Sequence, residues 1–92
     1  MDHAIAVNLV ERQLSRKGYE IIPSRDRRYD VKAHGPKNNL LVCVNHSPAG
    51  YALKKMREVA DGLDCILIRA DVWRIPIIGY HVRYLEIEDG VD

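Results

Sequence analysis

Two runs of consecutive apolar residues, residues 40–44 and residues 65–68, constrain the fold of this chain more than any other feature. Strands that face solvent on one side alternate apolar and polar residues, whereas strands covered on both faces are apolar throughout. Both runs are far shorter than the roughly 20 residues needed to span a bilayer. We therefore expect two central strands, over residues 40–45 and 65–68, and no membrane span.

The segment between the two runs has the pattern of a helix. Ser47 offers a hydroxyl that can cap free amides, and Pro48 stands at the first helical position, where its missing N–H costs nothing. An apolar stripe follows at helical spacing, and Gly62 is a typical helix end. The pattern predicts a helix over residues 47–61, so that residues 40–70 form a right-handed βαβ crossover with parallel strands.

The N-terminal part predicts a helix and two short strands. Apolar residues recur at helical spacing between residues 3 and 17, and Gly18 follows two basic residues as a helix end. A turn rich in Gly, Pro and Asn separates residues 29–33 from residues 40–45, so we expect an antiparallel hairpin. The remaining predicted strands are residues 19–22, ended by Pro23, and residues 77–88, a final edge strand.

Size and composition indicate one domain over residues 1–92, because a chain of 92 residues has room for a single hydrophobic core. The content of 47 % hydrophobic and 29 % charged residues is too apolar for a disordered chain. The N-terminus lacks a basic region followed by an apolar stretch, so we expect a cytoplasmic protein without a secretory signal. Cys43 and Cys65 lack the spacing of a zinc site, and we expect buried thiols.

Charge is distributed unevenly along the chain. Residues 1–46 carry eight Lys/Arg and five Asp/Glu (8 − 5 = +3), whereas residues 47–92 carry six and eight (6 − 8 = −2). The cations concentrate in one segment, at Arg12, Arg16, Lys17, Arg25, Arg27, Arg28, Lys32 and Lys37. Such a basic patch is what binding to a phosphate backbone requires, and a solvated protein surface is the alternative interpretation.

The predicted hairpin resembles the central hairpin of the PD-(D/E)xK nuclease superfamily. In that superfamily an Asp near the start of one strand, here Asp30, precedes a strand that ends in Glu-x-Lys. The chain is most similar to archaeal Holliday-junction resolvases, which also carry a Glu-Arg pair on an N-terminal helix, here Glu11-Arg12. Further likenesses over residues 5–70 are the Gly18-Tyr19 step and Arg25 in the loop before the Asp. The resemblance implies an α/β restriction-endonuclease-like core, with a mixed four- to five-stranded sheet flanked by two helices in the order αβββαβ(β).

The resemblance also implies a metal-dependent chemistry. A divalent metal neutralises the phosphate and activates a water, and Mg²⁺ prefers carboxylate oxygens. Here Cys43 occupies the Glu position and Asn45 the Lys position. A thiol is a poor ligand for Mg²⁺, and an amide can neither carry positive charge nor exchange a proton. If the site is active, Asp30 and Glu11 are the expected Mg²⁺ ligands, and Lys32, on the same strand face as Asp30, replaces the missing cation.

We therefore expect a nucleic-acid-binding domain of the nuclease fold that binds duplex or branched DNA without efficient cleavage. A homodimer is a further expectation. The expected DNA-binding residues are the basic residues Arg12, Arg16, Arg25, Arg27, Arg28 and Lys37. Lys32 is expected to contact DNA as well. Two alternatives remain open. One is a metal-dependent endonuclease or junction resolvase that uses Glu11, Asp30 and Lys32, and the other is a protein-interaction subunit that has kept only the fold.

Several of these residues also have simpler interpretations. Asp30 can be a solvated carboxylate at a strand end or an ion-pair partner for a loop arginine. His34 and His46 have no third ligand at usable spacing, so we interpret them as surface histidines. Cys43 alternates with valines on a central strand, which indicates packing rather than nucleophilic reactivity. Trp73 can stack on a base, cover the core or contact a second copy.

Overall fold

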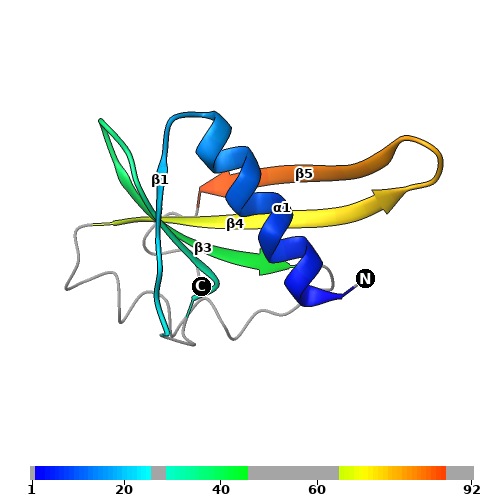
Figure 1. Ribbon diagram of the computed structural model, residues 1–92, viewed down its shortest axis with the longest axis horizontal. Helices are drawn as coiled ribbons and strands as arrows, with labels where there is room; N and C mark the ends of the chain where they lie inside the picture. Colours follow the sequence, from blue (N-terminus) through cyan, green and yellow to red (C-terminus); the bar gives the residue numbers. More distant parts are fainter. Residues whose placement is uncertain (1, 26–28, 46–64, 87–92) are drawn as a thin grey trace.

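A computed structural model describes residues 2–25, 29–45 and 65–86. This part of the chain contains one helix that lies across one face of a sheet (Figure 1). The elements, in chain order, are α1 (His3–Arg16), β1 (Glu20–Ile22), β2 (Val31–His34), β3 (Asn39–Asn45), β4 (Ile66–Ile75) and β5 (Gly79–Glu86). The protein is thus an α/β fold with a five-stranded sheet.

The sheet is open and mixed, and its strands follow the chain in the order β1-β2-β3-β4-β5. The predicted hairpin is confirmed, because β2 pairs with β3 in antiparallel register. The predicted parallel pair is confirmed as well, since β3 runs parallel to β4. The edge strands β1 and β5 are antiparallel to their neighbours. The helix predicted over residues 47–61 lies outside the described residues, as does the handedness of the crossover.

Both ends of α1 are capped by residues next to them in the sequence. At the N-terminus the Asp2 carboxylate accepts a hydrogen bond from the Ala4 N–H at 2.9 Å. At the C-terminus Gly18 adopts φ +96°, and the N–H groups of Gly18 and Tyr19 donate to the carbonyls of Ser15 and Leu14. This is the Schellman pattern, which only a residue tolerant of positive φ completes without strain. In the described part of the chain, no helix is long and apolar enough to cross a membrane.

The main core lies between α1 and the sheet. Ala6, Val10 and Leu14 form the buried stripe of the helix. They pack on the face of the sheet that we call the helix face, which carries Val31, Ala33, Leu40, Val42, Val44, Ala70 and Val72. Two side-chain contacts join the helix to β5: the Tyr84 hydroxyl donates to Gln13 Oε1 at 2.8 Å, and Lys17 Nζ lies 4.5 Å from the centre of the Tyr84 ring.

The opposite side of the sheet, the reverse face, carries the alternate residues of each strand. Leu41, Cys43 and Leu67 are buried there and form a second cluster with Tyr29. The central strand β3 is therefore buried on both faces, as its continuous apolar run predicts.

The turn between β2 and β3 depends on one glycine. A Cβ at Gly35 would lie 2.5 Å from the Tyr19 ring and 2.9 Å from the Asn38 carbonyl oxygen. The Gly35 N–H donates to that carbonyl at 2.9 Å and closes the turn. The absence of a side chain thus lets Tyr19 pack over the end of the hairpin.

Strand β4 is longer than the sequence analysis predicts. We expected a strand over residues 65–68, whereas β4 extends to Ile75. Arg69 and Asp71 interrupt the apolar run, but they alternate with Ala70 and Val72, which are buried on the helix face. The alternation of inward and outward residues therefore continues along β4 after the apolar run ends. Beyond Ile68 the strand is apolar on the helix face and carries charged residues on the other face.

Replacing Val10 with alanine tests the packing of α1 on the sheet. Val10 has an exposed fraction of 0 %, so Val10→Ala should lower the free energy of unfolding by about 2 kcal/mol through lost burial and a small cavity. Urea denaturation followed by circular dichroism measures the change. Ser15→Ala on the exposed side of the same helix is the control and should change stability by less than about 0.5 kcal/mol. Equal effects of the two substitutions would contradict this packing.

Candidate nucleic-acid interface

Asp30 lies immediately before β2 and is bound on both oxygens. Its Oδ2 accepts a hydrogen bond from the Val44 N–H at 2.7 Å, and its Oδ1 lies 2.9 Å from His3 Nε2. The Asp30 N–H donates to the Val42 carbonyl at 3.0 Å. Because β2 begins only at Val31, the Asp30 side chain provides the acceptor that an additional strand residue would otherwise supply to Val44. Asp30 thus joins the beginning of α1 to the central strand.

The structure does not bring Glu11 close to Asp30. Glu11 lies eight residues after His3, which is about 12 Å further along the helix axis. An open pocket beside Asp30 is lined by the first turns of α1 and the segment after β1: His3, Ala4, Val7, Asn8, Ser24, Arg25 and Tyr29. Glu11 is half-buried and is not among these residues. The two predicted metal carboxylates therefore lie apart.

Lys32 lies on the opposite face of the sheet from α1, whereas Asp30 precedes β2 and bonds to His3 of α1. Lys32 is half-buried on β2 and pairs in register with Leu41, which places it on the reverse face. Cys43 lies on that face too, two residues further along β3. The structure therefore places the predicted Asp30 and Lys32 beside the strand that carries the Glu position of the resemblance.

Cys43 is buried and surrounded by charge. Burial raises the pKa of the Cys43 thiol to about 11. The negative charges of Asp30 and Asp71 add to this rise, and the positive charge of Arg69 opposes it. The thiol is therefore protonated at neutral pH and is a poor nucleophile and a poor metal ligand. The interpretation of Cys43 as a packing residue agrees with its burial.

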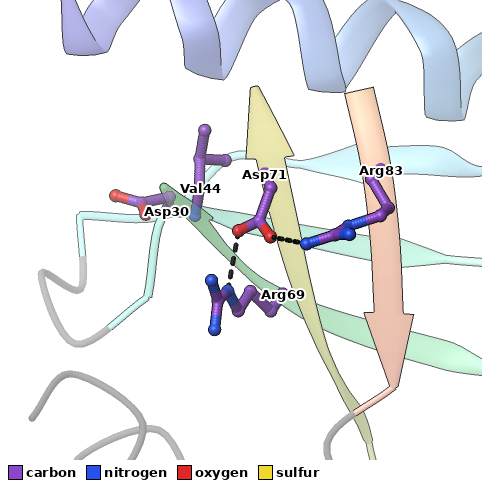
Figure 2. Close-up of polar contacts among 5 residues, drawn as sticks. All are labelled: Asp30, Val44, Arg69, Asp71 and Arg83. Carbon is purple, nitrogen blue, oxygen red and sulfur yellow. Dashed lines mark hydrogen bonds and ion pairs between the residues drawn. The ribbon is translucent and has the colours of Figure 1, made fainter. Parts of the chain in front are cut away.

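Asp71 is the buried carboxylate of the reverse face, and two arginines neutralise it. Arg69 Nε donates to Oδ1 at 2.7 Å, and an Arg83 guanidinium nitrogen donates to Oδ2 at 3.2 Å. Figure 2 shows Asp71 between the two guanidinium groups, with Asp30 on the other side of β3. Asp71 is in register with Asn45, the position at which the resemblance places a Lys.

These residues do not offer the oxygen ligands that Mg²⁺ prefers. Asp30 is engaged by His3 and Val44, Asp71 by two arginines, and the group at position 43 is a protonated thiol. Within residues 2–25, 29–45 and 65–86, no group of three His, Cys, Asp or Glu side chains is arranged to hold a metal ion. The described residues therefore do not fit the magnesium site that the resemblance implies.

The predicted DNA-binding residues that the structure describes lie near the two ends of β2 and on α1. Arg25 is exposed beside Asp30, whereas Lys37 is exposed in the turn at the other end of β2. Arg12 and Arg16 are exposed one turn apart on α1, so they present charge on one side of the helix. Arg27 and Arg28 lie outside the described residues, as does His46, whereas His34 is exposed as expected.

Sequence reasoning missed the partners of the two aspartates. His3 is the partner of Asp30 across 27 positions, and Arg83 is the partner of Asp71 across 12. No local pattern shows contacts of this kind. The alternation of residues 68–75 was the available signal for Arg69 and Asp71, because it places both on one face of a continuing strand.

Comparison with known proteins does not assign the chain to a family. No family model matches it, and no curated protein matches it either.

The raised pKa of Cys43 predicts slow alkylation. In a Cys65→Ser background, iodoacetamide should modify Cys43 at pH 8 at least about 100-fold more slowly than an ordinary thiol, because a pKa of about 11 leaves little thiolate. The rate should increase as the pH rises toward 11. Mass spectrometry of timed samples measures it, with glutathione as the reference thiol and with modification of the urea-unfolded protein as the control for access. A Cys43 rate equal to that of glutathione at pH 8 would contradict a buried, protonated thiol.

Removing the charge of Asp71 should destabilise the protein. Asp71→Asn leaves Arg69 and Arg83 without their anionic partner, and we expect a loss of about 1–2 kcal/mol, limited because both arginines are partly exposed to solvent. Denaturant unfolding at low and at high salt measures it. Glu86→Gln, at an exposed position near the end of β5, is the matched control and should have almost no effect. A neutral result for Asp71→Asn would show that the network contributes little to stability.

Proposed function

We propose that this domain binds duplex or branched DNA through its exposed cations and does not cleave it efficiently. One observation carries the proposal: the metal-binding groups that the nuclease resemblance implies are not available. Asp30 is bound by His3 and the Val44 N–H, and the position of the expected glutamate holds the protonated thiol of Cys43. A nuclease-like framework without its metal chemistry retains the surface that contacts phosphates.

The order of elements supports the nuclease-like part of the proposal. A helix, a strand, an antiparallel hairpin and a parallel strand follow one another, and a final antiparallel strand completes the sheet. This is the order that the resemblance implies, apart from the second helix, whose predicted residues 47–61 are not described. The restriction-endonuclease-like core is therefore part of the proposal.

The exposed cations support DNA as the partner. Arg12 and Arg16 project from one side of α1, and Arg25 borders the pocket beside Asp30. Contacts to phosphates from such side chains bind DNA with little sequence selectivity and weaken steeply as salt rises. We further propose a homodimer, because β1 and β5 are edge strands in the described sheet and a second copy can cover such an edge.

A metal-dependent endonuclease is the second candidate, and the position of Lys32 favours it. Lys32 shares the reverse face with Cys43, the Glu position of the resemblance, as the relocated cation of an active site would. This candidate needs Mg²⁺ bound by Asp30 and Glu11, so Asp30 would have to exchange its present partners for the metal and Glu11 would have to move closer to Asp30.

The DNA-binding proposal predicts a specific loss of salt dependence. Arg12→Gln/Arg16→Gln should weaken binding to fluorescein-labelled duplex and four-way-junction DNA, and should reduce the slope of log K against log salt by about 2, since each lost phosphate contact removes roughly one counterion. Fluorescence anisotropy over a salt series measures both quantities. Arg12→Lys/Arg16→Lys retains the charge and should keep most of the slope. No binding by the unchanged protein at low salt would overturn the proposal and would favour a protein-interaction subunit.

The same DNA separates binding from cleavage when Mn²⁺ or EDTA is added. Asp30→Asn retains an oxygen acceptor for the Val44 N–H but removes the charge that a metal needs. We expect this variant to bind DNA at least as tightly as the unchanged protein, with no nicking by either one. Nicking that requires Mn²⁺ and disappears in Asp30→Asn and in Glu11→Ala would establish the endonuclease instead.

A further inference from the structure

The hairpin of β4 and β5 projects beyond the rest of the sheet. The pairing of β3 with β4 ends at Asp71, whereas β4 and β5 remain paired as far as Ile75 and Gly79. Four more residues of β4 therefore form a two-stranded ribbon about 13 Å long. Figure 1 shows this ribbon extending past the end of β3 and past α1. Its base is fixed, because Val72 is buried in the main core and Val82 packs against that core.

The tip of the ribbon presents two isoleucines to solvent. Ile77 is fully exposed and Ile78 has an exposed fraction of 80 %, next to Pro76 in the connecting loop. Ile77 also adopts φ +74°, a left-handed conformation that costs a β-branched residue roughly 1–3 kcal/mol. Glycine or asparagine would fit this position at lower cost. Neither burial nor backbone preference explains an isoleucine here.

The sides of the ribbon carry cations and aromatic rings without any carboxylate. Residues 72–82, which form the ribbon and its turn, contain one arginine and no Asp or Glu, and Arg83 follows at the base, paired with Asp71 at 3.2 Å. On the reverse face the Trp73 and His81 rings lie 4.5 Å apart, and the Arg83 guanidinium lies 6.0 Å from the Trp73 ring. Arg74 and Tyr80 face each other on the other side, where both are exposed. Each side of the ribbon thus pairs an aromatic group with positive charge.

This combination fits DNA better than a second copy or a membrane. The cores of protein interfaces are depleted of charge, whereas the ribbon carries Arg74 and has Arg83 at its base. Two isoleucines supply only about 3–6 kcal/mol of burial, which is little for membrane attachment. Apolar side chains that enter between base steps, with arginines on the flanking phosphates, are an established way to unstack and bend a duplex.

We propose that the β4–β5 ribbon is a DNA-binding arm whose Ile77 and Ile78 insert between base pairs while Arg74 and Arg83 contact the adjacent phosphates. The inference rests on the proposed DNA binding and adds to it a second contact surface, remote from Arg12 and Arg16. It assigns the strained tip a role in deforming the duplex. Trp73 and His81 then border the widened groove.

The test uses duplexes that carry 2-aminopurine at successive positions, because the fluorescence of this base increases when it unstacks. The unchanged protein at saturation should raise the fluorescence severalfold at one or more positions. Ile77→Gly/Ile78→Ser should abolish the increase and weaken binding about tenfold. Since glycine relieves the strain at Ile77, this variant should melt at the same temperature as the unchanged protein or higher, so a lost signal does not reflect unfolding.

Two further variants separate the parts of the arm. Leu85→Ser removes another exposed apolar side chain of β5, near the base of the ribbon, and should change neither fluorescence nor affinity. Arg74→Gln should weaken binding and lower the salt slope by about 1, but should retain the fluorescence increase at saturation.

The outcomes distinguish this inference from the proposed function. Salt-dependent binding without any increase in fluorescence, or an unchanged increase with Ile77→Gly/Ile78→Ser, would overturn the arm and leave DNA binding intact. An absence of binding at low salt would overturn both. If Ile77→Gly/Ile78→Ser has no effect on DNA binding but dissociates a dimer in sedimentation, the tip is a dimer interface and the inference fails. If it instead releases the protein from anionic vesicles, the tip is a membrane-binding surface and the inference fails as well.

Discussion

The parallel pairing of β3 with β4 is the contact on which the rest of this structure depends. Strand β3 is buried on both faces, and its backbone positions both Asp30 and Asp71. Asp30 is held by the Val44 N–H, and Asp71 lies opposite Asn45 in the parallel register. A slip of this register by one residue would turn Asp71 and its arginines into the helix core, where their charges would have no partners. The apolar residues of β4 therefore fix the position of its charges.

The elements could be predicted where one physical signal dominates. Continuous apolar runs identified both central strands, and Gly18 identified the end of α1, because each of these signals is local. The length of β4 was underestimated because the prediction followed the apolar run and gave less weight to the alternation after it. The projecting ribbon was missed for a second reason. Its existence depends on where β3 stops, and the sequence of β4 does not contain that information.

The candidate site divides in a similar way. The local motif identified Asp30, Cys43 and Lys32 as residues of one hairpin, and the structure places Cys43 and Lys32 on one face, with Asp30 just before β2 beside His3. It did not identify His3 or Arg83, because these partners are brought together only by the packing of α1 and by the pairing of β5. The expected proximity of Glu11 to Asp30 came from the resemblance, and it requires a position along the helix axis that the sequence pattern does not determine. Periodicity specifies the face of a helix but not its placement over the sheet.

The buried carboxylate of the reverse face, Asp71, is neutralised by arginines. A glutamate at position 43 would lie between the charges of Asp30 and Asp71, and three neighbouring carboxylates would require a divalent cation or a raised pKa. The protonated thiol of Cys43 removes one of these charges, and Arg69 and Arg83 neutralise Asp71. Because Arg83 also lies near Trp73, this compensation joins the buried network to the base of the ribbon. A phosphate bound at Arg83 would compete with Asp71 for the same guanidinium, so contact with DNA and stability of the network are coupled through one side chain.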